Sequence, residues 1–251
     1  MGTSSLDRGQ IPVAILCGGR GTRLQEQTHA IPKALVEIGG KPIIWHVVRI
    51  YAAQGFRRFV LLTGYLGEMI DEFVATNPWP EPVEVRCVPT GEDTQTGGRV
   101  ARAAEHLGDR TFCLTYADGV ADIDLGGLLD HHEGRGLAAT MTVVRPYSQW
   151  GIALIDEQGR IEGFREKPRL DYWINGGFFC LEPAFLEWVE DDSVLEREPL
   201  ERAAGAGQLT AFRHDGFWDC MDTYKDAITL NDLWAAGQAP WCVWTPEQAT
   251  A

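Results

Sequence analysis

The sequence predicts an α/β protein with a Rossmann-like, mixed but mainly parallel sheet flanked by helices and a small antiparallel extension. Three observations predict this fold. Short apolar runs end at glycine or polar residues, which is typical of strands buried on both faces. Amphipathic segments with helical spacing separate these runs, and the alternation implies parallel pairing. After Val144 the alternation gives way to two short strands around a polar turn, which predicts the antiparallel part.

The first half of the chain alternates strands with helices. Val13 to Leu16 is a continuous apolar run and predicts the first buried strand. In "KPIIWHVVRIYAAQG", apolar residues from Ile43 to Tyr51 share one helical face and Gly55 is a stop signal. The alternation continues through the strand "RRFVLLTGY", the helix "GEMIDEFVA", the strand "VEVRCV", a helix from about 99 to 107, the strand "TFCLTYADG", a helix from about 125 to 132 and the strand "AATMTVV".

The second half departs from this pattern. "GIALIDEQGRIEGF" predicts two strands joined by a turn at Gly159, and we expect this hairpin or antiparallel edge to be added to the sheet. A helix from about Tyr224 to Ala236 closes the fold. The chain has no Ser- or Pro-rich linker and no repeat of about 20 to 50 residues. We therefore expect a flexible tail over 1–10, a single domain over 11–244 and a tail over 245–251.

Composition and charge disfavour several functional classes. A chain of 251 residues with 45% apolar residues can bury one full core. Its net charge of −14 argues against a surface for nucleic acid or anionic membranes. No apolar run approaches the roughly 18 residues of a membrane span, and residues 1–10 lack the apolar core of a signal peptide. Six widely spaced cysteines without C-x-x-C fit reduced core thiols, so we expect a cytoplasmic protein with neither nucleic-acid nor membrane partners.

A glycine-rich loop follows the first predicted strand. In "LCGGRGTRL", residues 16–24, Gly18, Gly19 and Gly21 leave backbone N–H groups accessible at the carboxyl end of a strand, and Arg20 and Arg23 supply positive charge. This combination predicts a phosphate cradle, although a tight strand-to-loop turn also requires glycine. The spacing matches neither a P-loop nor the dinucleotide fingerprint.

Further motifs extend this pattern along the chain. "GGRGTRL" and "PKALVEIGGKPII" closely resemble the N-terminal signature of the sugar-1-phosphate nucleotidyltransferases. "TQTGGRVA", "LTYADGVAD", "GFREKP", "INGGFF" and "FWDCMDT" then follow in the order and at roughly the spacings of the glucose-1-phosphate cytidylyltransferase subgroup. The resemblance covers about residues 11 to 244. It implies a Rossmann-like sheet, a divalent cation and a reaction that releases pyrophosphate.

The resemblance also implies roles for individual residues. Arg23, Lys33 and Asp118 form the implied catalytic set, and Asp118 and Asp222 are the implied ligands of Mg²⁺, which prefers oxygen donors. The implied nucleotide-binding residues are Leu16, Gly18, Gly19, Arg20, Gly21, Thr22, Thr96, Gly97, Gly98 and Asp118. The implied sugar-phosphate-binding residues are Tyr116, Glu166, Lys167, Asn175 and Gly176.

Structural alternatives exist for several of these positions. Either aspartate is also typical of a turn or helix N-cap, and an isolated lysine such as Lys33 is usually a solvated surface charge. "TQTGGR" also fits a loop before the helix near Arg99, and "NGG" also fits a turn. Tyr116 also fits packing at the pocket rim, and Glu166 an exposed ion pair.

Two departures from the family pattern bear on the substrates. Relatives that use CTP carry a long insertion between the strand near Val88 and the TGG loop, whereas here only "PTGEDTQ" separates them. A paired basic motif of close relatives is reduced to "IPKA", so a basic residue is lost at Ile31. The best interpretation is still transfer from CTP to glucose 1-phosphate by a homo-oligomer, with the base, the sugar and the oligomer left open.

Other functions compete with this interpretation. The same reaction with dTTP, UTP, GTP or ATP, or with a heptose or other modified sugar 1-phosphate, fits the same motifs. A non-catalytic subunit that senses nucleotides or sugar phosphates is a different class, and the intact set of charged residues argues against it. A nicotinamide-dependent oxidoreductase is disfavoured because the dinucleotide fingerprint fails.

Overall fold

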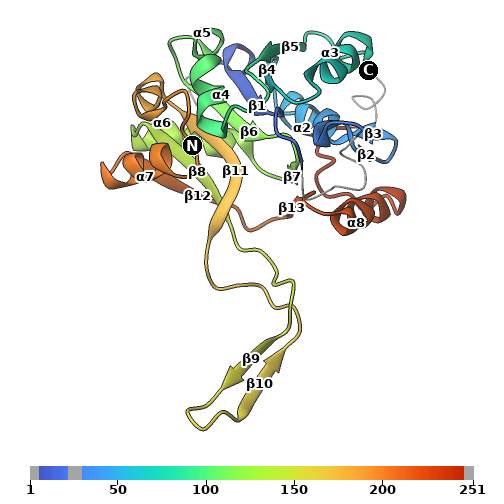
Figure 1. The fold of residues 1–251 in the computed structure, drawn as a ribbon, viewed down its shortest axis with the longest axis vertical. Coiled ribbons are helices and arrows are strands. Elements are labelled where there is room, and N and C mark those ends of the chain that lie inside the picture. Colours follow the sequence, from blue (N-terminus) through green and yellow to red (C-terminus); the bar gives the residue numbers. More distant parts are fainter. Residues whose placement is uncertain (1–5, 22–29, 246–251) are drawn as a thin grey trace.

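The computed structural model describes residues 6–21 and 30–245, and a seven-stranded sheet forms its centre (Figure 1). The strand order is β12-β8-β11-β6-β1-β4-β5, and within this sheet β11 runs antiparallel to its neighbours while the other pairings are parallel. The strands are β1 (Pro12–Leu16), β4 (Arg58–Thr63), β5 (Glu84–Pro89), β6 (Phe112–Tyr116), β8 (Ala139–Val144), β11 (Ile174–Leu181) and β12 (Leu209–Arg213). The predicted mixed, mainly parallel sheet is confirmed.

Helices cover both faces of the sheet, and a separate apolar core lies between each face and the helices that cover it. Because successive strand residues point to opposite faces, Val13 and Ile15 of β1 enter one core and Ala14 and Leu16 the other. The first core takes α2 (Ile43–Ala52), α3 (Gly67–Thr76), α6 (Leu125–Arg135) and α8 (Tyr224–Ala235). The second takes α4 (Thr96–Arg102), α5 (Ala104–Leu107), the 3₁₀ helix η4 (Pro183–Trp188) and α7 (Glu198–Gly205).

The predicted hairpin forms, but it is not added to the central sheet. β9 (Ile152–Ile155) and β10 (Ile161–Arg165) pair only with each other and form the end of an arm that projects away from the body (Figure 1). Its apolar side chains are exposed: Ile155 is 63%, Phe164 64% and Ile161 66% accessible. The alternation of the hairpin was readable from sequence, but its separation from the sheet was not.

A short ladder that the sequence analysis missed brings distant segments together. β7 (Gly119–Ala121), just after β6, pairs antiparallel with β13 (Trp218–Cys220), just before α8. A second small ladder joins β2 (Glu37–Ile38) to β3 (Lys41–Pro42). These strands have two or three residues each, too few for a periodic signal.

Several boundaries differ from the sequence-based expectation. The helix expected over 99–107 begins at Thr96 and is divided at Ala103 into α4 and α5. Within the expected N-terminal tail, Arg8–Gln10 form the 3₁₀ helix η1, capped by Asp7. All six cysteines are free thiols. Over the residues described, no helix has the length and apolar character needed to cross a membrane.

Candidate active site

Two adjoining pockets open at the carboxyl ends of β1 and β6. Leu16 and Tyr116, the last residues of these strands, lie side by side in the sheet. The chain leaves β1 toward β4 on one side and returns to β6 on the other, so this is the position where an α/β sheet binds ligands. Both pockets have volumes near 350 Å³, and Tyr116, Asp118 and Asp222 line both.

The two pockets collect most of the predicted residues. The first pocket is lined by Leu16, Cys17, Gly19, Gly21, Lys33, Ala34, Thr96, Tyr116, Ala117, Asp118 and Asp222. The second is lined by Thr115, Tyr116, Asp118, Gly119, Asn175, Gly176, Gly177, Phe178, Trp218, Cys220 and Asp222. We call them the glycine-loop pocket and the β11 pocket.

Lys33 joins the two carboxylates where the pockets meet. Its Nζ lies 2.5 Å from Asp118 Oδ2 and 2.7 Å from Asp222 Oδ1. The Lys33 side chain is only 16% exposed, so it is not the solvated surface charge considered as its alternative. Burial opposes the charge on Lys33, but Asp118 and then Asp222 outweigh burial and raise its pKa above the ordinary value.

Backbone pairing explains why these carboxylates meet. The β7–β13 ladder aligns Gly119 with Cys220, and the N–H of Met221 donates to the carbonyl of Asp118 at 2.9 Å. Asp222 therefore emerges opposite Asp118. Thr223 and Asp226 form a capping box at the start of α8, and the N–H of Asp222 donates to Asp226 Oδ2 at 3.1 Å, which holds Asp222 at the helix entrance.

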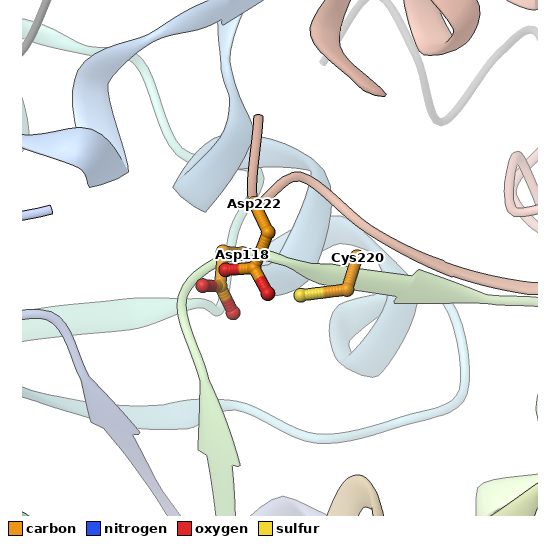
Figure 2. Close-up of side chains that lie close together, drawn as sticks. All are labelled: Asp118, Cys220 and Asp222. Carbon is orange, nitrogen blue, oxygen red and sulfur yellow. The ribbon is translucent and has the colours of Figure 1, made fainter. Parts of the chain in front are cut away.

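The donors present suit a hard divalent cation. Figure 2 shows Asp118 and Asp222 directed at one another from different segments, with the thiol of Cys220 beside them. One ligand atom from each of these three residues lies within 4.8 Å of the others. Burial, reinforced by the nearby carboxylates, raises the pKa of the Cys220 thiol and keeps it protonated, which leaves the two carboxylates as ligands for a cation that prefers oxygen.

The glycine loop is shaped by a buried arginine that the sequence analysis did not assign to the site. Arg99 of α4 donates to the carbonyls of Gly18 at 2.9 Å, Thr63 at 3.1 Å and Gly91 at 2.7 Å. A Cβ on Gly18 would lie 2.1 Å from an Arg99 nitrogen, so glycine is required there for close approach of the guanidinium. Gly19 has open space around it and lines the pocket, as Gly21 does.

The remaining residues predicted for the loop fall in two groups. Arg20 is exposed, stacks over Tyr65 and forms ion pairs with Glu92 at 2.6 Å and Asp93 at 3.0 Å. Arg20 therefore has to exchange these partners before it can contact a phosphate. Thr22 and Arg23 lie outside the described residues.

The TGG motif is the first turn of α4 rather than a loop before a helix. Thr96 lines the glycine-loop pocket. Gly97 and Gly98 are buried against residues 191–193, and the N–H of Gly98 donates to the carbonyl of Ser193 at 3.1 Å. The structure thus brings Thr96 into the pocket lining and uses the two glycines for close packing.

The predicted sugar-phosphate residues are divided between the pocket and the arm. Tyr116, Asn175 and Gly176 line the β11 pocket, and Asn175 Nδ2 donates to the Tyr116 hydroxyl at 3.3 Å. Glu166 and Lys167 follow β10 at the base of the hairpin and line neither pocket of their own chain. Their side chains are 66% and 53% exposed, respectively.

A carboxylate that sequence reasoning missed lies beside both pockets. Glu196, in the segment between η4 and α7, accepts hydrogen bonds from the Tyr116 hydroxyl and, at 2.8 Å, from Thr96 Oγ1. Arg99 stands inside the quoted motif "TQTGGRVA" but was given no role in the site, and Glu196 stands in an acidic stretch of the sequence that no quoted motif covers.

Comparisons with known proteins identify the family of the chain and support its fold. The nucleotidyl transferase family model matches residues 13–238. The chain is 42% identical to a probable glucose-1-phosphate cytidylyltransferase of Bacillus subtilis (strain 168) and 41% identical to the glucose-1-phosphate cytidylyltransferase of Salmonella typhi, with 92% of this chain and 98% of each relative covered. The crystal structure of HddC from Yersinia pseudotuberculosis superposes with a TM-score of 0.71 at 22% identity, covering 90% of this chain and 100% of that one. The chain therefore belongs to the nucleotidyl transferase family.

Proposed function

We propose that this nucleotidyltransferase moves a cytidylyl group from CTP to glucose 1-phosphate in a Mg²⁺-dependent reaction that yields CDP-glucose and pyrophosphate. The observation that carries the proposal is the contact of Lys33 with both Asp118 and Asp222 where two pockets meet. The names of the relatives that are 41–42% identical favour CTP and glucose 1-phosphate over the other nucleotides and sugars.

The proposed chemistry needs alignment and charge more than proton transfer. A phosphate oxygen of the sugar 1-phosphate attacks the α-phosphorus of CTP, and the bond from that phosphorus to the pyrophosphate oxygen breaks. The second pKa of a phosphate monoester is near 6, so the attacking group is largely dianionic at neutral pH and requires no general base. Asp118 and Asp222 would hold Mg²⁺, which offsets phosphate charge when bound.

The chain's own residues would supply the remaining interactions. Lys33 would place its ammonium against the charge that develops as pyrophosphate leaves. We assign the triphosphate to the glycine-loop pocket, with Leu16, Gly19, Gly21 and Thr96 as its walls and Arg23 as an additional cation. Tyr116, Asn175 and Gly176 would hold the sugar in the β11 pocket.

The arm supports assembly into a homo-oligomer. An isolated hairpin with exposed apolar side chains is marginally stable unless a partner covers it, and a second copy of this chain is the partner we propose. Lys167, which the family pattern assigns to the sugar phosphate, lies directly after β10 in this arm and outside both pockets of its own chain. Docking of the arm on a neighbour would allow Lys167 to serve that neighbour's pocket.

Two further assignments complete the proposal. Residues 11–244 would act as a single catalytic domain, since Trp244 and α8 pack into the same core as β1. The six free cysteines fit a reducing compartment, and we propose the cytoplasm, where nucleoside triphosphates are also available.

Pyrophosphate release tests the proposal. CTP, UTP, dTTP, GTP and ATP would each be combined with Mg²⁺ and a panel of hexose and heptose 1-phosphates, with and without EDTA. We expect release with CTP and glucose 1-phosphate, and its loss with EDTA. Pyrophosphate release with another nucleotide and sugar phosphate instead would show that CTP and glucose 1-phosphate are not the substrates. No release with any pair, together with a raised melting temperature in the presence of nucleotide, would favour the non-catalytic sensor.

A further inference from the structure

The two pockets are linked by one carboxylate with both of its oxygens engaged. Glu196 Oε1 accepts from the hydroxyl of Tyr116, and Oε2 accepts from Thr96 Oγ1 at 2.8 Å. Tyr116 lines both pockets, and Thr96 lines the glycine-loop pocket. A single side chain therefore contacts the walls of both the proposed nucleotide and the proposed sugar pocket.

Close backbone packing fixes the segment that carries Glu196. A Cβ on Gly98 would lie 2.0 Å from the carbonyl oxygen of Asp191, so helix α4 can approach this segment only with glycine at that position. The N–H of Leu195 donates to Thr96 Oγ1 at 2.9 Å, and Leu195 is fully buried. The backbone next to Glu196 is thus anchored even though the Glu196 side chain itself is exposed.

These contacts form a continuous chain of hydrogen bonds whose donors point toward Glu196 from both sides. The N–H of Gly177 donates to Asn175 Oδ1 at 2.8 Å, and Asn175 Nδ2 donates to the Tyr116 hydroxyl at 3.3 Å. The Tyr116 hydroxyl in turn donates to Glu196, and so does the Thr96 hydroxyl. The chain begins in the β11 pocket and ends at the first turn of α4, with the carboxylate accepting from both sides.

We infer that Glu196 is a positioning residue that couples the two pockets, so that occupation of one by its substrate favours binding in the other. This inference rests on the proposed assignment of nucleotide and sugar 1-phosphate to these pockets. A ligand that orders Tyr116 in the β11 pocket also orders Glu196, and through it Thr96. Because coupling between two binding sites is reciprocal, a nucleotide ordered against Thr96 must favour the sugar phosphate by the same factor.

Glu196→Gln tests the inference with little change in shape. The amide keeps one acceptor oxygen and places an NH₂ donor where the other oxygen was, so one of the two hydroxyls loses the oxygen to which it donates. A lost hydrogen bond to a charged group corresponds to roughly a tenfold to hundredfold change in an equilibrium constant. We expect the KM values for CTP and for glucose 1-phosphate to rise about tenfold or more, with kcat within about threefold of wild type.

Binding measurements isolate the coupling from turnover. Calorimetry with a non-hydrolysable CTP analogue would be carried out with and without saturating glucose 1-phosphate. In wild type we expect the sugar phosphate to tighten analogue binding, and in Glu196→Gln we expect this effect to be lost. Tyr116→Phe and Thr96→Val each remove one side of the connection and should also lose it, whereas Glu201→Gln, an exposed change on α7, should retain it.

The outcomes separate this inference from the proposed function. Equal coupling in wild type and Glu196→Gln, or no coupling in wild type, would overturn the inference whatever the turnover. A fall in kcat with unchanged KM values would also overturn it and make Glu196 a participant in the chemical step. Absence of pyrophosphate release from wild type, with coupling present and dependent on Glu196, would overturn the proposed reaction and leave the coupling supported.

Discussion

Lys33 is held in place mainly by charge. Its ammonium contacts both Asp118 and Asp222, and the three groups together carry one net negative charge. All three side chains are partly screened from water, with 16% of Lys33, 22% of Asp118 and 38% of Asp222 exposed. Their interactions are therefore stronger than those of a surface ion pair, and each member has a distinct expected effect when it is removed.

Lys33→Ala should lower kcat by on the order of 100-fold or more, because an ammonium that meets developing charge is removed. The fold should survive, since the side chain contributes little apolar packing. Steady-state kinetics and the melting temperature would be measured together. Lys225→Ala, an exposed lysine on α8, is the matched control and should behave as wild type. If Lys33→Ala kept the wild-type rate, Lys33 would form a structural ion pair and would take no part in turnover.

Asp222→Asn should also reduce turnover severely, by on the order of 100-fold or more, and should raise the Mg²⁺ concentration needed for half-maximal rate. The amide keeps the size of the side chain but removes the charge that attracts the cation. Rates would be measured across a Mg²⁺ titration, with Asp232→Asn on the exposed side of α8 as control. An unchanged Mg²⁺ dependence would remove Asp222 from the metal site.

Single residues differed in how readily the sequence revealed them. Asp118, Asp222 and Lys33 stood in short family motifs, and the structure places them together. Arg99 and Glu196 act through contacts with segments 81 and 100 residues away in sequence, and no local periodicity or motif reports such contacts.

At the scale of elements, the arm is the segment with the clearest need for a partner. Ile155 and Ile161 face each other across the β9–β10 ladder, and both are largely exposed. Ile155→Glu combined with Ile161→Glu should convert the proposed homo-oligomer to monomer and should lower activity if Lys167 serves a neighbouring chain. Sedimentation velocity would report the mass. Glu157→Gln at the hairpin turn is the control, and an unchanged mass for the double variant would exclude the arm from the interface.

Helices and strands with a strong apolar periodicity were predictable from the sequence. Short strands that form only by pairing with a distant segment were not. α2 and β1 appeared at nearly their expected bounds, because apolar spacing decides them locally. β7 and β13 have three residues each and exist only through their pairing. The same limit applies to the arm, whose hairpin was predicted but whose separation from the sheet depends on the path of residues 145–151 and 166–173.

At the scale of the whole molecule, one buried histidine joins parts from both ends of the chain. His46 of α2 donates through Nε2 to the carbonyl of Ile38 at 2.9 Å and accepts at Nδ1 from Trp241 at 3.2 Å. Trp234 and Trp244 pack against its ring. Burial lowers the pKa of His46 to about 4, so the neutral form is the one that fits this environment.

Global stability should fall as the solution is acidified below the ordinary histidine pKa. The folded-state pKa of His46 lies below its unfolded value of about 6.5, so this stabilisation is complete above pH 6.5 and is lost as pH falls toward 4. Urea unfolding at several pH values would measure the free energy of unfolding. His46→Gln should reduce its decline over this range, and an identical decline in wild type and variant would exclude His46 as the cause.

The β7–β13 ladder also determines when during synthesis the site can exist. Asp118 and Asp222 reach one another only through backbone pairing between segments about 100 residues apart. A nascent chain that already holds the glycine loop, Lys33 and Asp118 has no second carboxylate until residue 222 has emerged from the ribosome. A nascent chain that has not reached residue 222 therefore cannot assemble the proposed cation site, and the proposed use of a nucleoside triphosphate has to wait until β13 has paired with β7.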